Sequence, residues 1–574
     1  MECCYNAKQA LFLVSLCMVA KLGVAQLASV KNINTTPCSA AMLLCSPSCH
    51  DISSMPSNLA AGNGKLYFFA KDNTSTEIWE SDGSPAGTLK ISNIGNNYSA
   101  PSNMLYYNDN LYFTAQSTLY GQELFRFNLK SKTYFIIDIY LGSGGSNPTE
   151  LTLCNNYLVF AAAVKNSVTD FGRELVFYDG NTLYVKDLRV GTAGSSPAFV
   201  TVLNNQLYFS ADGNKDGLEK GIELWNDLGI LTSVPQRKTD IASGTSSSNP
   251  RNMTLVGDYV YFTATDPSLG AELCRFNIVT NAYELIDLYA GGYGSAPEYL
   301  VELEGKVFFS ADINTAAQPN RGRELASYTG TTLGVADLVK GSGSSNPSNL
   351  FKLGTTLYYV ANKTVNDVSY GYELWKRAAN NSSTTLVKDI NSGINSSLPS
   401  NLIAIGDTLF FMAFNNNQWE LWKTSGTAAS YAGDLNGPSA GSGLFVVGNL
   451  TSVASTLFFT ADNGSQGTEL WKYVSGTNLL GRMDEESEAC STCHSSEQEQ
   501  AGNTILLYPN PAREWLFVQS AESVQRIIVL DLQGVELVRK ERENKVDISV
   551  LPRGMYWADV TSETKRERKK FIVE

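Results

Sequence analysis

The chain has 574 residues, and its 43 basic side chains against 56 acidic ones give a formal net charge of −13. It has no basic stripe of the kind that holds a phosphate backbone, which argues against nucleic acid as a partner. Aromatic residues, Gly, Asn, Ser and Thr are plentiful and long helix-forming runs are absent, so the composition predicts an all-β protein.

The N-terminus predicts a secretory signal peptide over residues 1–25. Lys8 precedes an apolar run from Ala10 to Ala20, and Gly23 and Ala25 stand at the small-residue positions of a cleavage site. The apolar run is too short to span a bilayer. No later segment is long and apolar enough to cross a membrane, so we expect an exported protein without a transmembrane segment.

After a Cys-containing segment over residues 26–53, a Glu-Leu-aromatic phrase recurs with a mean spacing of about 49 residues. Such self-similarity indicates a repeat architecture. The nine glutamates of the phrase are Glu77, Glu123, Glu174, Glu223, Glu272, Glu324, Glu373, Glu420 and Glu469.

Each copy carries four strand signals, and four strands with their connections fit a period of this length. Runs such as Leu207–Ala211 are apolar without alternation, so both of their faces are expected to be buried. We therefore predict a large β-propeller of about eight or nine four-stranded blades over residues 54–481, with a β-solenoid as the alternative. The ninth copy lacks a final strand after Trp471, and the segment before Pro56 could supply it and close the ring.

The repeats resemble the ELWxxDGT repeat family of secreted bacterial proteins. The first copy, "EIWESDGSPAGT" at 77–88, is close to the full consensus, and "ELWKTSGT" at 420–427 is a near copy. In other copies the aromatic position departs from Trp and indicates a need for apolar bulk, with Phe125, Val176, Cys274 and Ala326 in its place. The resemblance implies no reaction.

The repeated glutamate predicts a structural role, because a residue used nine times at even intervals is not nine times catalytic. We expect each carboxylate to accept backbone N–H groups of the adjacent turn, with about 1.5–3 kcal/mol of stabilisation for each charged hydrogen bond.

The fourth copy contains a candidate calcium loop. The consensus D-x-[DN]-x-[DN]-G-x5-E is matched with Gly217 at the turn position. Strands rather than helices flank the loop, so it resembles the calcium loops of integrin-type propeller blades and not an EF-hand. A solvated acidic hairpin is the alternative. The candidate ligands are Asp212, Asn214, Asp216, the Leu218 carbonyl and Glu223.

The cysteines suggest three chemistries. Cys154 and Cys274 are expected to be buried core thiols. An acidic linker at 482–503 contains "CSTCH" (490–494), which matches the haem c attachment motif but lacks helices to enclose a porphyrin. Zinc shared between the two cysteine clusters is a further alternative. For an exported chain, disulfides among the clustered cysteines are the preferred interpretation, the candidates being Cys38, Cys45, Cys49, Cys490 and Cys493.

From residue 504 to 574 short alternating strands predict a small Ig-like β-sandwich. Its motifs "YPNP" (508–511), "DLQG" (531–534), "LPRGMY" (551–556) and the terminal "KKFIV" (569–573) resemble the C-terminal sorting domain of the type IX secretion system of Bacteroidota. The resemblance implies the type IX machinery as a partner and an extracellular or outer-membrane-surface location.

Three functions are compatible with this sequence. The preferred hypothesis is a non-enzymatic binding or adhesion module whose ligand is an extracellular glycan or protein. A secreted hydrolase acting on polysaccharide or protein is the alternative, although the chain shows no nucleophile elbow, no acidic pair unique to one copy, and no histidines besides His50 and His494. An electron-transfer protein with haem at "CSTCH" is a minor alternative. Fold alone does not decide among them.

Overall fold

The computed structural model describes residues 26–34, 53–365, 368–380, 383–415, 418–426, 428–432, 446–462, 467–474, 506–508, 515–519, 523–531, 535–562 and 566–573. The predicted signal peptide and the linker at 482–503 lie outside these residues. The chain divides into two compact units, residues 1–480 and 481–574. In the described ranges both are built from strands, apart from the 3-10 helix η1 (Gly95–Asn97), and no helix there is long and apolar enough to cross a membrane.

The described part of the first unit contains nine four-stranded antiparallel sheets, numbered here as blades 1 to 9 in chain order. The blade count agrees with the nine copies of the repeat. The inner strands of blades 1 to 9 are β2 (Ser57–Gly62), β6 (Tyr98–Tyr107), β10 (Thr149–Cys154), β14 (Ala198–Leu203), β18 (Arg251–Val256), β22 (Glu298–Leu303), β26 (Ser348–Leu353), β30 (Ser400–Ile405) and β34 (Val446–Val453).

The remaining strands follow outward in each blade. The second strands are β3 (Lys65–Lys71), β7 (Asn110–Ser117), β11 (Tyr157–Lys165), β15 (Gln206–Ala211), β19 (Tyr259–Asp266), β23 (Lys306–Ile313), β27 (Thr356–Val365), β31 (Thr408–Asn415) and β35 (Thr456–Asp462). The third strands are β4 (Thr76–Ser81), β8 (Gly121–Asn128), β12 (Asp170–Tyr178), β16 (Glu223–Asp227), β20 (Gly270–Asn277), β24 (Gly322–Tyr328), β28 (Val368–Ala378), β32 (Gln418–Thr424) and β36 (Thr468–Val474). The outer strands are β5 (Leu89–Lys90), β9 (Thr133–Ile137), β13 (Leu183–Lys186), β17 (Gln236–Arg237), β21 (Tyr283–Ile286), β25 (Leu333–Ala336), β29 (Thr385–Lys388), β33 (Ser430–Tyr431) and, for blade 9, β1 (Gln26–Lys31).

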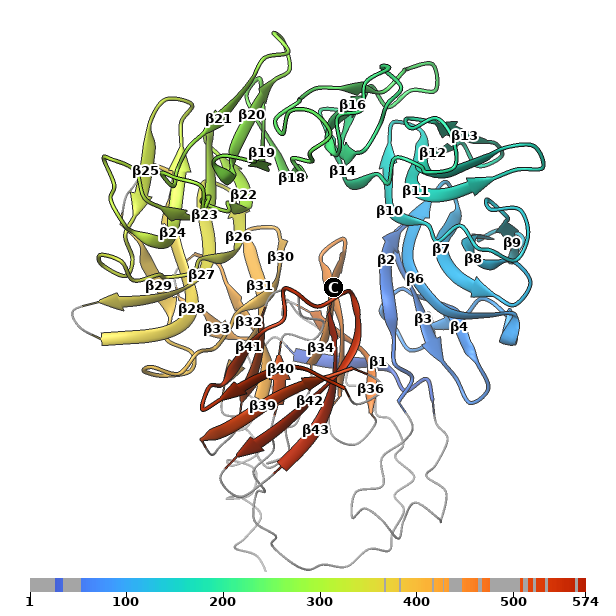
Figure 1. The fold of residues 1–574 in the computed structure, drawn as a ribbon. Coiled ribbons are helices and arrows are strands. Elements are labelled where there is room, and N and C mark those ends of the chain that lie inside the picture. The colour runs from blue at the N-terminus through green and yellow to red at the C-terminus, as the bar shows by residue number, and fades with distance from the viewer. Residues whose placement is uncertain are drawn as a thin grey trace, which may run out of the picture. The chain divides into compact units, whose positions relative to one another are not determined.

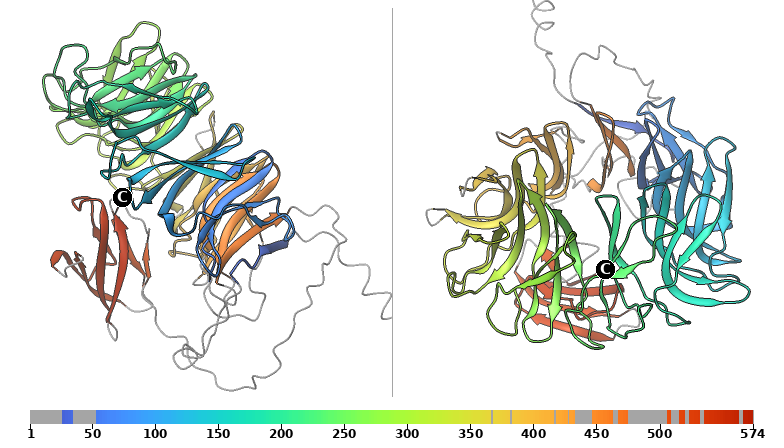
Figure 2. Two further views of the ribbon diagram at one scale, coloured as in Figure 1. Left: turned by 90° about the vertical axis from the view of Figure 1, so that its right-hand side faces the viewer. Right: turned by 90° about the horizontal axis from the view of Figure 1, so that it is seen from above.

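The blades form a closed ring (Figure 1). The inner strand of each blade lies against that of the next, and β34 of blade 9 lies against β2 of blade 1. Figure 2 shows the same succession of blades in chain order from two further directions. The outermost strand of blade 9 is the N-terminal strand β1, which pairs antiparallel with β36. An N-terminal strand therefore completes the last blade, as the lack of a final strand in the ninth copy predicted. The fold is a nine-bladed β-propeller.

The core lies between successive blades, because their middle strands are buried on both faces. Leu207 and Phe209 of β15 are fully buried, and Phe209 packs in one cluster with Phe177 of the preceding blade. The aromatic position of the repeat is buried whether it holds Trp, Phe, Val, Cys or Ala, which confirms that it requires apolar bulk. Where Trp is present it can also donate, as Trp225 Nε1 does to the Ala211 carbonyl at 3.0 Å.

The second unit is a seven-stranded sandwich in its described residues. One sheet has the order β37 (Leu506–Tyr508), β38 (Trp515–Gln519), β41 (Lys545–Asp547), and the other β40 (Glu536–Glu541), β39 (Val524–Leu530), β42 (Gly554–Ser562), β43 (Arg566–Val573). Leu516 and Val546 of the first sheet pack against Val529 and Val560 of the second in a single core. This agrees with the predicted small β-sandwich.

Candidate functional site

The repeat glutamates are structural, as the sequence predicted. Glu373 shows the arrangement: its Oε1 accepts the N–H groups of Asn391 and Ser397 at 3.4 and 3.0 Å, and its Oε2 accepts the Ile390 N–H at 3.2 Å and the Ser397 hydroxyl at 2.5 Å. These donors belong to the turn between blades 7 and 8. Eight of the nine glutamates are fully buried, Glu420 being half-buried. Each of the eight buried carboxylates therefore fixes the turn that follows its own blade.

Burial also changes the acidity of these groups. It raises the pKa of five of the glutamates to about 7, although the serine hydroxyl and backbone N–H groups that they accept lower it. A carboxylate with such a pKa could act as a general acid. Here each one lies in a separate blade with its lone pairs directed at its own turn, so they form no catalytic pair. The five are Glu123, Glu174, Glu272, Glu324 and Glu373.

A basic residue two positions after the glutamate's leucine connects one blade to the next. Lys376 of blade 7 donates to the carbonyl of Gly426 in blade 8, and Arg126 of blade 2 donates to that of Gly180 in blade 3. The glycine belongs to the Asp-Gly or Ser-Gly turn of the following repeat. The basic residue and the glycine of the repeat phrase thus contact each other between neighbouring copies rather than within one copy. The sequence analysis missed this relationship.

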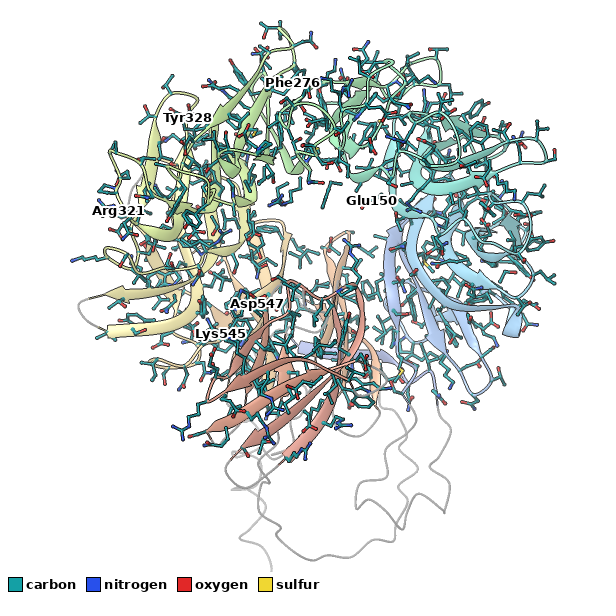
Figure 3. The ribbon with its side chains drawn as sticks, viewed as in Figure 1. Glu150, Phe276, Arg321, Tyr328, Lys545 and Asp547 are labelled. Atoms are coloured by element: carbon teal, nitrogen blue, oxygen red, sulfur yellow. The ribbon has the colours of Figure 1, made fainter. Side chains whose placement is uncertain are left out.

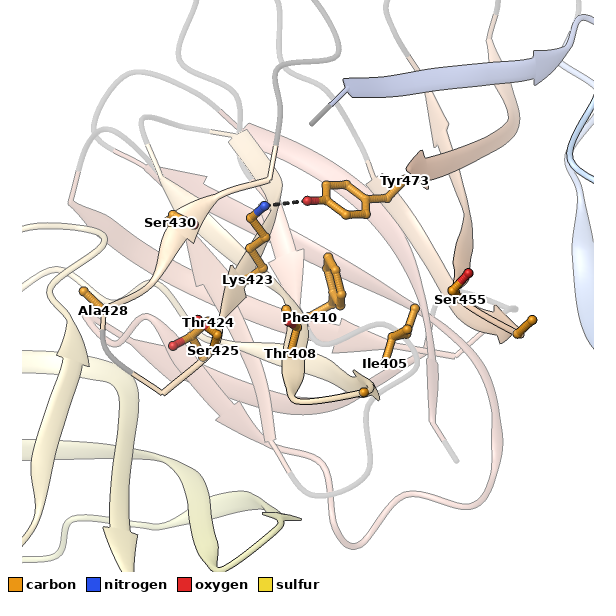
Figure 4. A pocket seen from close by; sticks show the side chains of 12 residues that line it. Ile405, Thr408, Phe410, Lys423, Thr424, Ser425, Ala428, Ser430, Ser455 and Tyr473 are labelled. Carbon is orange, nitrogen blue, oxygen red and sulfur yellow. Dashed lines mark hydrogen bonds between the residues drawn. The ribbon is translucent and has the colours of Figure 1, made fainter. Parts of the chain in front are cut away.

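Between blades 8 and 9 a cavity is present. The ammonium group of Lys423 donates to the hydroxyl of Tyr473 there (Figure 4). The cavity measures about 690 Å³ and lies where the β30–β31, β32–β33 and β34–β35 turns meet. Its described lining residues are Ile405, Gly406, Thr408, Phe410, Lys423, Thr424, Ser425, Ala428, Ser430, Ala454, Ser455 and Tyr473.

The described lining of this cavity combines hydroxyl groups with two aromatic rings and one cation. Phe410 and Tyr473 contact each other edge to face, with their ring centroids 4.9 Å apart. Lys423 lies over the Tyr473 ring at 5.0 Å. No carboxylate, histidine or cysteine is among the described lining residues. Acid–base hydrolysis of a glycosidic bond requires two carboxyl groups, which the described lining lacks.

The predicted calcium ligands lie on the loop between β15 and β16, and the structure gives them protein partners. Asp212 pairs with Arg189 at 2.7 Å, and Asp216 pairs with Arg237. Glu223 points into its blade, where it accepts from the Thr239 hydroxyl at 2.8 Å.

The other positions of that loop are exposed or bonded locally. Asn214 donates to Glu219 at 2.8 Å, and the Leu218 side chain is exposed. Gly217 has a φ of 80°, as a sharp turn at that position requires. Within the described ranges no three His, Cys, Asp or Glu residues gather as a metal site. Calcium binding here stays a prediction.

The described cysteines behave as expected, since Cys154 and Cys274 are buried free thiols. Burial raises the pKa of Cys154 to about 11, so the thiol is unreactive at neutral pH. The haem motif at 490–494, His50 and the five cysteines of the disulfide prediction lie outside the described residues.

An all-β ring of nine blades followed in the chain by a small sandwich defines the class of protein, and a family model identifies the sandwich. Residues 506–574 match the Secretion system C-terminal sorting domain. The second unit is therefore a type IX secretion sorting domain, and the chain is a secreted or cell-surface propeller protein exported by that system. No curated protein matches the sequence.

Several solved structures are similar at low identity. PorZ, a bacterial surface component of the type IX secretion system of Porphyromonas gingivalis, is 10% identical with a TM-score of 0.32, and the match covers 92% of this chain and 82% of PorZ. The propeller domain of the Trilobed protease from Pyrococcus furiosus is 8% identical with a TM-score of 0.32, covering 61% of this chain and 98% of that domain. A puromycin hydrolase is 11% identical with a TM-score of 0.34, covering 75% and 61%.

Proposed function

We propose that this protein is a non-enzymatic binding module that holds an extracellular glycan in the cavity between blades 8 and 9. The composition of that cavity carries the proposal. Thr408, Ser425 and Ser455 offer hydroxyl groups, and Phe410 and Tyr473 offer aromatic rings. Apolar surface with a few convergent polar groups is the usual character of a ligand site.

The charge in the cavity favours an acidic sugar. Lys423 is the one cation among the described lining residues, in a chain whose net charge is −13. Its ammonium group has three donors and one of them is given to Tyr473. A carboxylated glycan would accept the others, because a charged hydrogen bond is about twice as strong as a neutral one.

Export suits this role. The sorting domain places the propeller outside the cell, where glycans and matrix proteins are the available ligands. The resemblance of the repeats to the ELWxxDGT family and of the sorting motifs to those of Bacteroidota supports a surface protein of such a bacterium. Adhesion through this module follows if the cell-attached form retains the site.

The test is a glycan array probed with the mature secreted protein, with neutral and uronic-acid oligosaccharides side by side. We expect binding to acidic oligosaccharides and a loss of about tenfold or more in Lys423→Met, since a charged hydrogen bond of 1.5–3 kcal/mol is removed. Arg126→Met is the matched control, because it removes the corresponding basic residue at the junction of blades 2 and 3 and should leave glycan binding unchanged.

Two results would overturn the proposal. Equal binding by Lys423→Met and wild type would place the ligand elsewhere. Release of reducing sugars from a polysaccharide, abolished by substitution of one carboxylate, would instead establish the hydrolase alternative.

A further inference from the structure

Every inner strand contains a residue in the left-handed region of the backbone, which is the second residue of the strand in seven of the nine blades. This residue is the second after the proline of the turn in blades 1 to 8, and its φ lies between 50° and 60° in all nine blades. The strand register shifts at the same place, for example between Ser348 and Phe351. Asparagine tolerates this conformation better than other residues with a side chain. It occupies the position in six blades: Asn58, Asn103, Asn252, Asn349, Asn401 and Asn449.

Three of the asparagines, Asn58, Asn252 and Asn349, also connect neighbouring blades. Asn349 Nδ2 donates to the carbonyl of Pro399 in the next blade at 3.1 Å, and Asn58 Nδ2 donates to that of Pro101 at 3.1 Å. In these three blades asparagine therefore combines tolerance of a left-handed backbone with a donor aimed at the following blade.

Three blades depart from this rule, with Glu150 in blade 3, Phe199 in blade 4 and Tyr299 in blade 6. All three have φ between 56° and 60°, a conformation that is costly for bulky side chains. Their side chains are exposed, Phe199 and Tyr299 each to 42%. Strained residues that persist in a regular frame concentrate at functional sites. Two of the departures, Glu150 and Phe199, stand in consecutive blades.

A second cavity lies at the first departure. It measures about 340 Å³ and is lined by Asn103, Met104 and Leu105 of β6 together with Glu150 and Leu151 of β10. Figure 3 labels Glu150 on the inner side of the ring. The cavity therefore opens where the inner strands of blades 2 and 3 meet.

Glu150 is exposed and forms no ion pair with the other described residues, although Arg173 lies within electrostatic range of its carboxylate. Its Oε2 accepts one hydrogen bond, from the Val200 N–H at 3.3 Å. The neighbouring Arg173 directs its guanidinium to the carbonyls of Asn147 and Ala161, at 2.8 and 3.0 Å. Phe199, one residue before Val200, brings an exposed aromatic ring to the adjoining blade edge.

We propose that this cavity binds an alkylammonium group. The alkyl stem would lie against Met104, Leu105 and Leu151, and the ammonium would donate to the Glu150 carboxylate and the Asn103 amide oxygen. A carboxylate with an amide and apolar side chains around it is favourable for an alkylammonium ion, because the charged hydrogen bond is stronger than a neutral one. The same chemistry occurs in a lysine side chain of another polypeptide and in a free diamine. This site is separate from the glycan cavity between blades 8 and 9.

The mature secreted protein is titrated calorimetrically with Nα-acetyl-lysine methylamide, with 1,5-diaminopentane, and with Nα-acetyl-norleucine methylamide as the uncharged match. We expect an ammonium probe to bind and the norleucine amide to bind about tenfold or more weaker. Tighter binding of the lysine amide assigns a polypeptide ligand, and tighter binding of the diamine assigns a small amine. Failure of both ammonium probes to bind would overturn the proposal.

Substitutions distinguish an effect on ligand binding from an effect on the stability of the propeller. Glu150→Gln should weaken the ammonium probe about tenfold or more, and Glu150→Asn should do the same while raising the melting temperature, because asparagine fits the left-handed backbone. Tyr299→Asn is the matched control, which should raise the melting temperature and keep binding. Lys423→Met should also keep binding, so this proposal and the glycan proposal fail independently. Unchanged binding in both Glu150 variants would remove the site.

Discussion

The ammonium group of Lys472 in blade 9 donates a 2.5 Å hydrogen bond to the carbonyl oxygen of Gly83 in blade 1. The two residues lie at opposite ends of the repeat array, so this contact exists only in the closed ring. It repeats the connection between Lys376 and Gly426 in blades 7 and 8. Closure is therefore achieved by the same interaction that joins neighbouring blades, in addition to the pairing of β1 with β36.

Removal of this contact should destabilise the junction between blades 9 and 1. Lys472→Met retains the side chain's apolar length but loses the donor, and we expect the free energy of unfolding to fall by about 1–2 kcal/mol. Chemical denaturation followed by tryptophan fluorescence measures the change. Lys340→Met, at an exposed lysine, should change stability by less than about 0.5 kcal/mol. Equal effects of the two substitutions would show that the contact between Lys472 and Gly83 contributes nothing specific to stability.

The buried glutamates should be far more sensitive than the half-buried one. Glu373→Ala leaves the N–H groups of Ile390, Asn391 and Ser397 without their acceptor, and we expect a loss of about 3–5 kcal/mol at pH 8. Glu420→Ala, at the same repeat position in blade 8, should cost about 1 kcal/mol. Thermal unfolding by circular dichroism compares them, and a loss at Glu420 as large as at Glu373 would contradict the proposed role of burial.

Much of the ring could be predicted from the sequence because its constraints repeat. The sequence itself shows the spacing of about 49 residues, the apolar middle strands and the missing outer strand of the ninth copy. Periodicity also separated a structural glutamate from a catalytic one, since a catalytic residue need occur only once. The structure confirms these interpretations through Glu373 and its equivalents.

The candidate sites could not be predicted in the same way, because they depend on relationships between copies. Lys423 stands in a near-perfect repeat phrase, and its cavity is completed by Ala454, Ser455 and Tyr473 of blade 9. Glu150 and Phe199 look unremarkable in sequence, since nothing in a single copy reveals that the position requires a left-handed backbone. The first eight copies aligned on their prolines would have shown asparagine in five of them and drawn attention to the other three.

The raised pKa values of five buried glutamates predict an unusual dependence of stability on pH. In the folded protein Glu123 and its four equivalents have a pKa of about 7, against the ordinary 4.5. The folded protein therefore holds more protons between pH 4.5 and 7, and their stabilising contribution is lost as the pH rises through 7. One pKa unit corresponds to about 1.4 kcal/mol. We expect a higher melting temperature at pH 5.5 than at pH 8.

Few other groups titrate in this window, since the chain has only two histidines. The side chain introduced by Glu373→Gln cannot ionise, so this variant should show a smaller difference in melting temperature between pH 5.5 and pH 8 than the wild type. The difference that persists should come from the other four glutamates. Scanning calorimetry at both pH values measures it. A melting temperature that is equal at the two pH values, or higher at pH 8, would mean that the hydrogen bonds to these carboxylates outweigh their burial.

Calcium binding by the blade 4 loop is tested by competition with its arginine partners. Asp212 and Asp216 pair with Arg189 and Arg237, so a bound ion must replace both guanidinium groups. A calcium site predicts that EDTA lowers the melting temperature of the wild-type protein, because a ligand that binds only the folded state stabilises it by about 2.7 kcal/mol at a hundred times its Kd. The same treatment should leave Asp216→Ala unchanged, whereas Asp407→Ala, at an exposed turn in blade 8, should keep the wild-type response. An identical melting temperature with calcium and with EDTA would remove the site, because the arginine pairs would then suffice to neutralise the loop.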